Sequence, residues 1–193
     1  MAEENQFPSE VIDLPSEGKL YPEGSPLREG KLYLPDSPLT SGKIEVKYMT
    51  AKEEDILTSQ NLIKKGLVID KLLNSLIVTE GIKTDDLFIG DKNAVMVASR
   101  ILAYGGDYSV EVTNPNTGES FEHTFDLTDC PFKELSADVD YSTNEFELEL
   151  PITKLKITFK LLNGRDELSI ENELKSLRTQ KEAELETLRM TSE

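Results

Sequence analysis

The strongest helical pattern in the chain is Val68-Ile-Asp-Lys-Leu-Leu-Asn-Ser-Leu-Ile77. Apolar side chains recur there at i, i+3 and i+4, which places them on one face of an α-helix. Such a stripe packs in a core or in an interface, and a core is the commoner use. We therefore expect this helix to lie at the centre of a helical unit that covers residues 44–106.

Two further helices are predicted on either side of this stripe. Thr50 and Glu53 have the spacing of a capping box, so one helix begins after Thr50 and follows a short strand at 44–49. Asp91 is the predicted N-cap of the other helix, which ends at Gly105-Gly106. Helix capping and the helix dipole explain the acidic residues near both starts, so these residues do not indicate a metal site.

From residue 107 the pattern changes to the alternation of β-strands. We expect a small antiparallel sheet in a β unit at 107–162. Its strands are predicted at 108–113, 121–127, 145–150 and 153–162. A charged C-terminal helix is predicted within 163–193, and its apolar stripe is sparse and lacks a heptad seam. It frays in solvent, packs on a partner or continues into a longer chain. The predicted fold class is therefore α+β.

The first 43 residues are predicted to form an extended arm, because they hold most of the prolines and show no helical or alternating period. A 12-residue repeat runs from Glu17 to Leu27 and again from Glu29 to Leu39. It is either a duplication that lengthens a linker or a strap whose Leu and Tyr side chains dock on a partner. The residues expected to contact a partner, within the arm and beyond it, are Leu14, Leu20, Tyr21, Leu27, Leu32, Tyr33, Leu39, Tyr48, Leu174 and Leu177.

Composition excludes several classes of function. The formal net charge is -16, so we expect the protein to repel nucleic acid rather than bind it. No stretch reaches the roughly 18 consecutive apolar residues of a membrane span. The start of the chain is acidic where a signal peptide would be basic and then apolar. We therefore expect a protein that is made in a cytoplasm and binds neither nucleic acid nor membrane.

The chain has a single cysteine, Cys130, and a single histidine, His123, which cannot complete a tetrahedral zinc site or an intrachain disulfide. His123 alternates with Phe121 and Phe125, so it is predicted to be packed on the apolar face of a strand rather than to act as a base. Cys130 is predicted to be a small buried hydrophobe. Neither a calcium loop nor a phosphate loop occurs in the sequence. We therefore expect no enzymatic activity, no cofactor and no metal ion.

Three stretches together carry a family resemblance. They are Ile12-Asp-Leu-Pro-Ser-Glu-Gly-Lys-Leu-Tyr-Pro22, Gly42-Lys-Ile-Glu-Val-Lys-Tyr-Met-Thr-Ala-Lys-Glu-Glu-Asp-Ile-Leu57 and Ile89-Gly-Asp-Lys-Asn93. Over essentially its whole length the chain resembles the baseplate hub and hub-assembly proteins of T-even-like myoviruses, which are bacteriophages with contractile tails. The resemblance implies a role in the tail without catalytic residues. Many family members have a C-P-x-C-G metal knuckle where this chain has Asn114-Pro-Asn-Thr-Gly118, so metal binding is not implied here.

The predicted function is that of a structural component of a tail baseplate hub, which acts through protein–protein contacts in tail assembly. Its expected partners are other phage baseplate or tail proteins, or further copies of the same chain in a symmetric ring. The alternative is a transient tail-assembly chaperone that is absent from the mature virion. The expected location is the virion, after assembly in the host cytoplasm.

Overall fold

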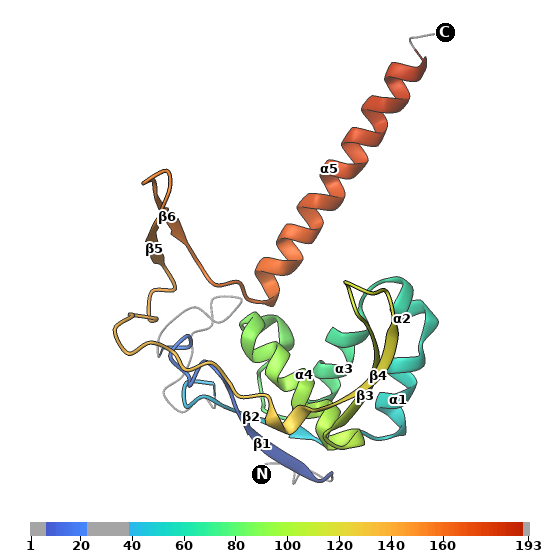
Figure 1. Cartoon of the computed structure of the whole chain (residues 1–193), viewed down its shortest axis with the longest axis vertical. Helices are drawn as coiled ribbons and strands as arrows, with labels where there is room; N and C mark the ends of the chain where they lie inside the picture. Colours follow the sequence, from blue (N-terminus) through green and yellow to red (C-terminus); the bar gives the residue numbers. More distant parts are fainter. Residues whose placement is uncertain (1–6, 23–38, 191–193) are drawn as a thin grey trace.

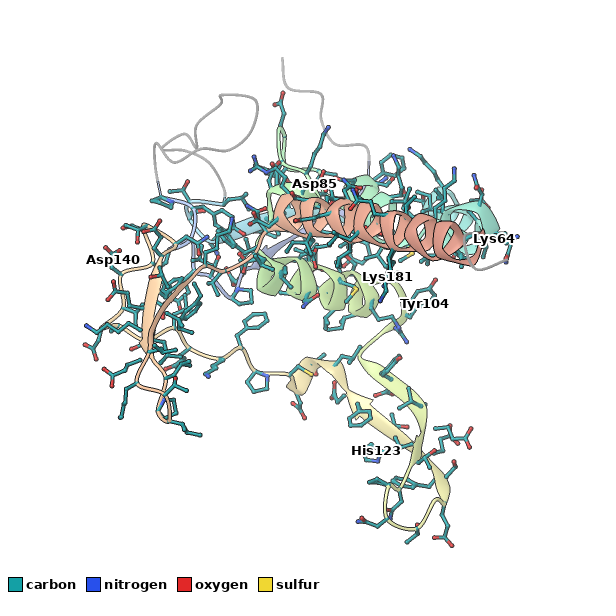
Figure 2. The ribbon with its side chains drawn as sticks, turned by 90° about the horizontal axis from the view of Figure 1, so that it is seen from above. Lys64, Asp85, Tyr104, His123, Asp140 and Lys181 are labelled. Atoms are coloured by element: carbon teal, nitrogen blue, oxygen red, sulfur yellow. The ribbon has the colours of Figure 1, made fainter. Side chains whose placement is uncertain are left out.

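The computed structural model describes residues 7–22 and 39–190, and Figure 1 shows their arrangement. The fold is α+β, as predicted. A body of short strands and helices carries a hairpin at 146–159 and a long helix that extend from it (Figure 1), and a second hairpin at 107–126 also extends from it (Figure 2). In chain order the elements are β1 (Ser9–Asp13), β2 (Lys43–Lys47), α1 (Ala51–Thr58), α2 (Gln60–Lys64), α3 (Val68–Leu76), the 3-10 helix η1 (Thr84–Asp86), α4 (Ile89–Tyr104), β3 (Asp107–Thr113), β4 (Ser120–Asp126), the 3-10 helix η2 (Leu127–Asp129), β5 (Phe146–Glu149), β6 (Lys156–Phe159) and α5 (Gly164–Met190).

The N-terminal segment is part of the body. β1 pairs antiparallel with β2, with Ile12 opposite Ile44. The core residues that the segment contributes are Leu14, Leu20, Tyr21 and Leu39. For residues 7–22 and 39–43 the prediction of an extended arm is therefore corrected. These residues gain backbone partners from β2 and bury their apolar side chains in the chain's own core.

Gly18 allows the N-terminal segment to fold back on itself. Its backbone is left-handed, with φ of 77°, and a Cβ atom built there would lie 2.1 Å from the carbonyl oxygen of Thr40. Only glycine fits, because the conformation and the close backbone approach both exclude a side chain. Residues 17–22, the described part of the first copy of the repeat, thus form a tight turn. Leu27, Leu32 and Tyr33 lie outside the described residues.

Helix α3 occupies the centre of the body, as its sequence predicts. It packs against α1 and α4 and buries Leu72, Leu73 and Leu76. α1 begins at the predicted capping box, where the Glu53 carboxylate accepts a hydrogen bond from the Thr50 amide at 3.0 Å. The prediction that this stripe packs in the core is confirmed for Leu72, Leu73, Leu76 and Ile77.

Asp91 has a different role from the predicted one. α4 begins at Ile89 with Phe88 as its N-cap, so Asp91 lies inside the first turn. Its buried carboxylate accepts hydrogen bonds from the Ser16 amide (3.0 Å) and the Tyr21 hydroxyl (2.6 Å). That hydroxyl in turn accepts from the Phe88 amide at 3.0 Å. The carboxylate therefore turns inward, and it holds the N-terminal segment against the start of α4.

The predicted β unit is two separate hairpins rather than one sheet. β3 pairs only with β4, and β5 pairs only with β6. Figure 2 shows the β3–β4 hairpin extending away from the helices, with His123 far from the body. The prediction of a single small sheet is corrected for this reason. The strands were placed within one or two residues for the first hairpin, but each hairpin stands apart from the other.

Helix α5 is attached to the body at its first turn and extends away from it (Figure 1). The Asn163 side chain caps the helix by accepting a hydrogen bond from the Asp166 amide at 3.0 Å, and the Gly164 amide donates to the Leu87 carbonyl at 3.1 Å. A Cβ atom on Gly164 would lie 2.8 Å from the Cα atom of Asp85. The close approach of two backbones therefore requires glycine where the helix leaves the body.

Candidate interaction surfaces

Most of the large apolar side chains that are exposed lie outside the body, on the two hairpins, on α5 and in the segments that join them. The exposed residues on the regular elements are Tyr108, Phe121 and Phe125 on β3–β4, Leu148, Ile157 and Phe159 on β5–β6, and Leu168, Ile170, Leu174 and Leu177 on α5. Concentrated apolar surface of this kind is typical of sites that bind another protein.

The β3–β4 hairpin has one apolar face and one polar face. Directly paired residues share a face, and the pairs on the apolar face are Tyr108 with Phe125, Val110 with His123, and Val112 with Phe121. The His123 ring lies edge-on to the ring of Phe125, with centroids 4.5 Å apart. The exposed fractions of Tyr108, Phe121 and Phe125 are 44%, 51% and 47%. His123 therefore lies on an apolar strand face, as predicted, but that face is open rather than packed.

The β5–β6 hairpin repeats this amphipathic design. Phe146 and Phe159 are paired across the strands with ring centroids 5.5 Å apart, and Leu148 is paired with Ile157 on the same face. The Tyr141 ring extends the aromatic group, with its centroid 5.8 Å from that of Phe146. The body does not cover Leu148, half of whose surface is exposed. This hairpin offers a second apolar strip.

Helix α5 has a narrower apolar stripe between charges of both signs. Leu174 and Leu177, two of the residues predicted to contact a partner, are 49% and 54% exposed. Glu171 and Lys175 form an ion pair of 2.7 Å on the same helix. The stripe is therefore available for contact and is bordered by both acidic and basic groups.

An ion-pair cluster fixes the root of α5. The Lys92 ammonium on α4 lies 2.8 Å from the Asp70 carboxylate on α3 and 3.3 Å from the Glu167 carboxylate on α5. Partial burial by itself would lower the pKa of Lys92, but the two carboxylates raise it above its ordinary value. Lys92 therefore stays charged and joins three helices at the point where α5 leaves the body.

The sequence of this chain matches a known family. The family model described as T4 bacteriophage base plate protein matches residues 31–185, which include both hairpins and most of α5. The chain belongs to this family. No curated protein and no solved structure matches the chain. The predicted resemblance to phage baseplate proteins is thus confirmed, and the matched region of this base plate protein covers both hairpins and α5 as far as residue 185.

The base plate protein uses several of its predicted contact residues for its own core. Leu14, Leu20, Tyr21 and Leu39 are at most 8% exposed, so the prediction that they contact a partner is corrected. Tyr48 is half-buried, and its hydroxyl donates a hydrogen bond to the Glu10 carboxylate. The exposure of the apolar faces of the hairpins was not predicted. The alternation of Phe121, His123 and Phe125 was the available signal, but it was interpreted as a core face.

The described part of this base plate protein contains no group of three or more His, Cys, Asp or Glu side chains that could hold a metal ion. Cys130 is exposed rather than buried, because it lies in the segment that leaves the first hairpin. Two hollows of about 420 and 490 Å³ lie beside α4, and their linings are mainly apolar. Among the described helices, none has the length and apolar character needed to cross a membrane.

Proposed function

We propose that this base plate protein is a structural component of the baseplate hub and acts by contact with other tail proteins rather than by catalysis. The observation that carries the proposal is the set of apolar faces on β3–β4, β5–β6 and α5, all of which extend from the body (Figures 1 and 2). These faces suit a chain that is assembled into a larger particle. In the proposed scheme the protein joins the tail in the host cytoplasm and stays in the virion.

Elementary energetics supports a role for these elements in binding. A two-stranded hairpin is only marginally stable in water by itself. A helix gains most of its stability in a protein from packing its apolar face, and the stripe of α5 at Leu174 and Leu177 is open. A partner that covers such faces gains apolar burial and orders the elements at the same time. We therefore assign the contacts to the projecting elements, with the body as the platform that holds them.

The test substitutes two residues of the apolar stripe of α5 in cells that produce the tail. A double variant, Leu174→Ser with Leu177→Ser, is supplied in place of the wild-type chain, and the matched control is Glu173→Ser with Arg178→Ser on the same helix. We expect the stripe variant to be incorporated into purified tails about tenfold less than the control, since each tenfold in affinity needs only about 1.4 kcal/mol. Quantitative mass spectrometry of the tails gives the measurement.

Two outcomes would contradict the proposal. If the wild-type chain is needed for assembly but is missing from finished tails, the protein is a transient chaperone. If normal tails form without the chain, the protein is not a structural component of the tail. A fixed number of copies per tail, reduced in the stripe variant, supports a structural subunit.

A further inference from the structure

The β3–β4 hairpin differs from the other projecting elements in its charge. No Lys or Arg occurs from Ile101 to Phe132, a stretch that contains the whole hairpin. α5 by contrast carries acidic and basic side chains together, and β5–β6 has Lys156 opposite Glu149. The nearest basic side chain, Arg100, lies at the root of the hairpin, where its guanidinium carbon is 5.9 Å from the centroid of the Tyr108 ring.

Like charges are paired across the polar face of this hairpin. Glu111 lies directly opposite Glu122, and Asp107 lies directly opposite Asp126. Carboxylates that face each other across a ladder destabilise it. The remaining pairs on this face are hydroxyls, with Ser109 and Thr124 at 2.7 Å. Among the described residues, none of the ion pairs involves Glu111 or Glu122, so the hairpin's own chain leaves this repulsion in place.

The two faces together define the chemistry of a partner. The aromatic face needs an apolar surface to cover it, and the carboxylates on the opposite face need positive charge. Complementary charge in an interface steers encounter and fixes register, and carboxylates on the face opposite an apolar strip select against partners that reach that face with acidic groups. A second copy of this chain, with a net charge of -16 and the same acidic hairpin, is a poor match by this criterion.

We propose that the β3–β4 hairpin docks in a groove of a protein whose apolar surface covers the rings of Tyr108, Phe121 and Phe125 and whose Lys and Arg side chains reach Glu111 and Glu122 on the opposite face of the hairpin. The proposal rests on the proposed function and names the kind of partner for one of its surfaces. It sets this hairpin apart from α5, whose mixed charges do not require a basic partner.

Photocrosslinking in cells that produce the tail tests the proposal. One variant carries p-benzoylphenylalanine in place of Phe121, and a second carries it in place of Leu174. We expect the probe at 121 to crosslink to another tail protein, at a peptide in which Lys or Arg flanks apolar residues. Crosslinking only to a second copy of this chain, or to nucleic acid, would overturn the proposal.

A single charge reversal separates binding from folding. Glu111→Lys replaces a repelling pair with an attractive one opposite Glu122, so it should stabilise the hairpin while it weakens the contact with a basic partner. We expect the crosslink from position 121 to fall about three- to tenfold and the crosslink from position 174 to stay within about twofold. The matched control is Glu147→Lys on the polar face of β5–β6, which should leave both crosslinks unchanged.

The outcomes distinguish the two proposals. If Glu111→Lys leaves the crosslink from position 121 unchanged, or if only the probe at 174 crosslinks to a tail protein, the basic-partner proposal is overturned and the structural role stands. If neither probe crosslinks to a tail protein and tails form normally without the chain, the structural role fails, and the inference about the hairpin fails with it.

Discussion

Strands β2 and β4 have the same alternating pattern and opposite surroundings. In β2, Ile44 and Val46 point into the core and are fully buried. In β4, Phe121 and Phe125 alternate with polar residues just as regularly, yet about half of each side chain is exposed. The difference is the layer above the strand, because α3 and the N-terminal segment contribute to the core around β2. Alternation identifies the apolar face of a strand, but it does not say whether the same chain covers that face.

Carboxylates also have different surroundings in the body and on the β3–β4 hairpin. In the body the buried Glu53 carboxylate accepts hydrogen bonds from Lys47 at 2.9 Å and Ser75 at 2.6 Å. On β3–β4, Glu111 and Glu122 face each other. The buried Glu53 carboxylate is therefore matched by donors of its own chain, whereas no ion pair among the described residues neutralises Glu111 or Glu122. If this contrast is correct, conservative changes should destabilise the free protein strongly in the body and weakly on the hairpin.

Glu53→Gln should have the largest effect on the free protein. Burial alone would raise the pKa of the Glu53 carboxyl, but hydrogen bonds from Ser75, Thr50 and Lys47 lower it to about 2, from an ordinary value of 4.5. The ionised group is thus favoured in the folded state, and its loss should lower the free energy of unfolding at neutral pH by about 3 kcal/mol. Denaturant unfolding gives the measurement, with Glu54→Gln at an exposed position as the control.

The pH dependence of this effect has a definite sign. Because the folded-state pKa is below the unfolded one, the stabilisation is complete above pH 4.5 and is lost as the pH falls towards 2. The difference between wild type and Glu53→Gln should shrink over that window. A difference that stayed constant with pH would mean that Glu53 acts through shape rather than charge.

Tyr21→Phe should have an intermediate effect. It removes the hydroxyl that joins the Asp91 carboxylate to the Phe88 amide, and it leaves both groups buried with one partner fewer. We expect a loss of about 1–3 kcal/mol in the free energy of unfolding. Tyr108→Phe on the hairpin is the matched control and should change it by less than about 0.5 kcal/mol. Equal changes in the free energy of unfolding for the two variants would contradict the contrast between body and hairpin.

Phe125→Ser should have the smallest effect on the free protein. Its ring contacts His123 on an exposed face, so the body loses no core packing when the ring is removed. The expected change in the free energy of unfolding is within about 0.5 kcal/mol. Thermal melting monitored by far-UV circular dichroism checks this. A large loss would show that the hairpin belongs to the cooperative unit of the body.

The sequence predicts those features that depend on neighbours along the chain. The capping box at Thr50, the apolar stripe that ends at Ile77 and the glycine at the end of α4 all depend on residues within a few positions of each other. Strand positions in the first hairpin could be predicted for the same reason, because the alternation is local. The prediction that these strands form one sheet was wrong, because local alternation carries no information about which strands lie side by side.

The errors concern contacts between distant segments. Tyr21 looked like a partner anchor because it lies beside proline in a segment without a regular period, but its hydroxyl meets Asp91, which is 70 positions away. Asp91 looked like an N-cap because acidic residues favour that position, yet its distant partners draw it into the core. The exposure of the apolar hairpin faces was not predicted, because it depends on the whole fold.

The attachment of α5 through a single turn has a geometric consequence. With 27 residues, the helix is about 40 Å long, so it acts as a lever with its pivot at Gly164. A rotation of about 10° at the root would move the far end by about 7 Å, which is more than the helical pitch of about 5.4 Å. The direction of α5 is therefore set at its root, where Gly164 approaches Asp85 and the Lys92 ammonium pairs with Asp70 and Glu167. A Cβ atom added at Gly164 would lie 2.8 Å from the Asp85 Cα atom, and the length of the helix would enlarge any resulting shift at its far end.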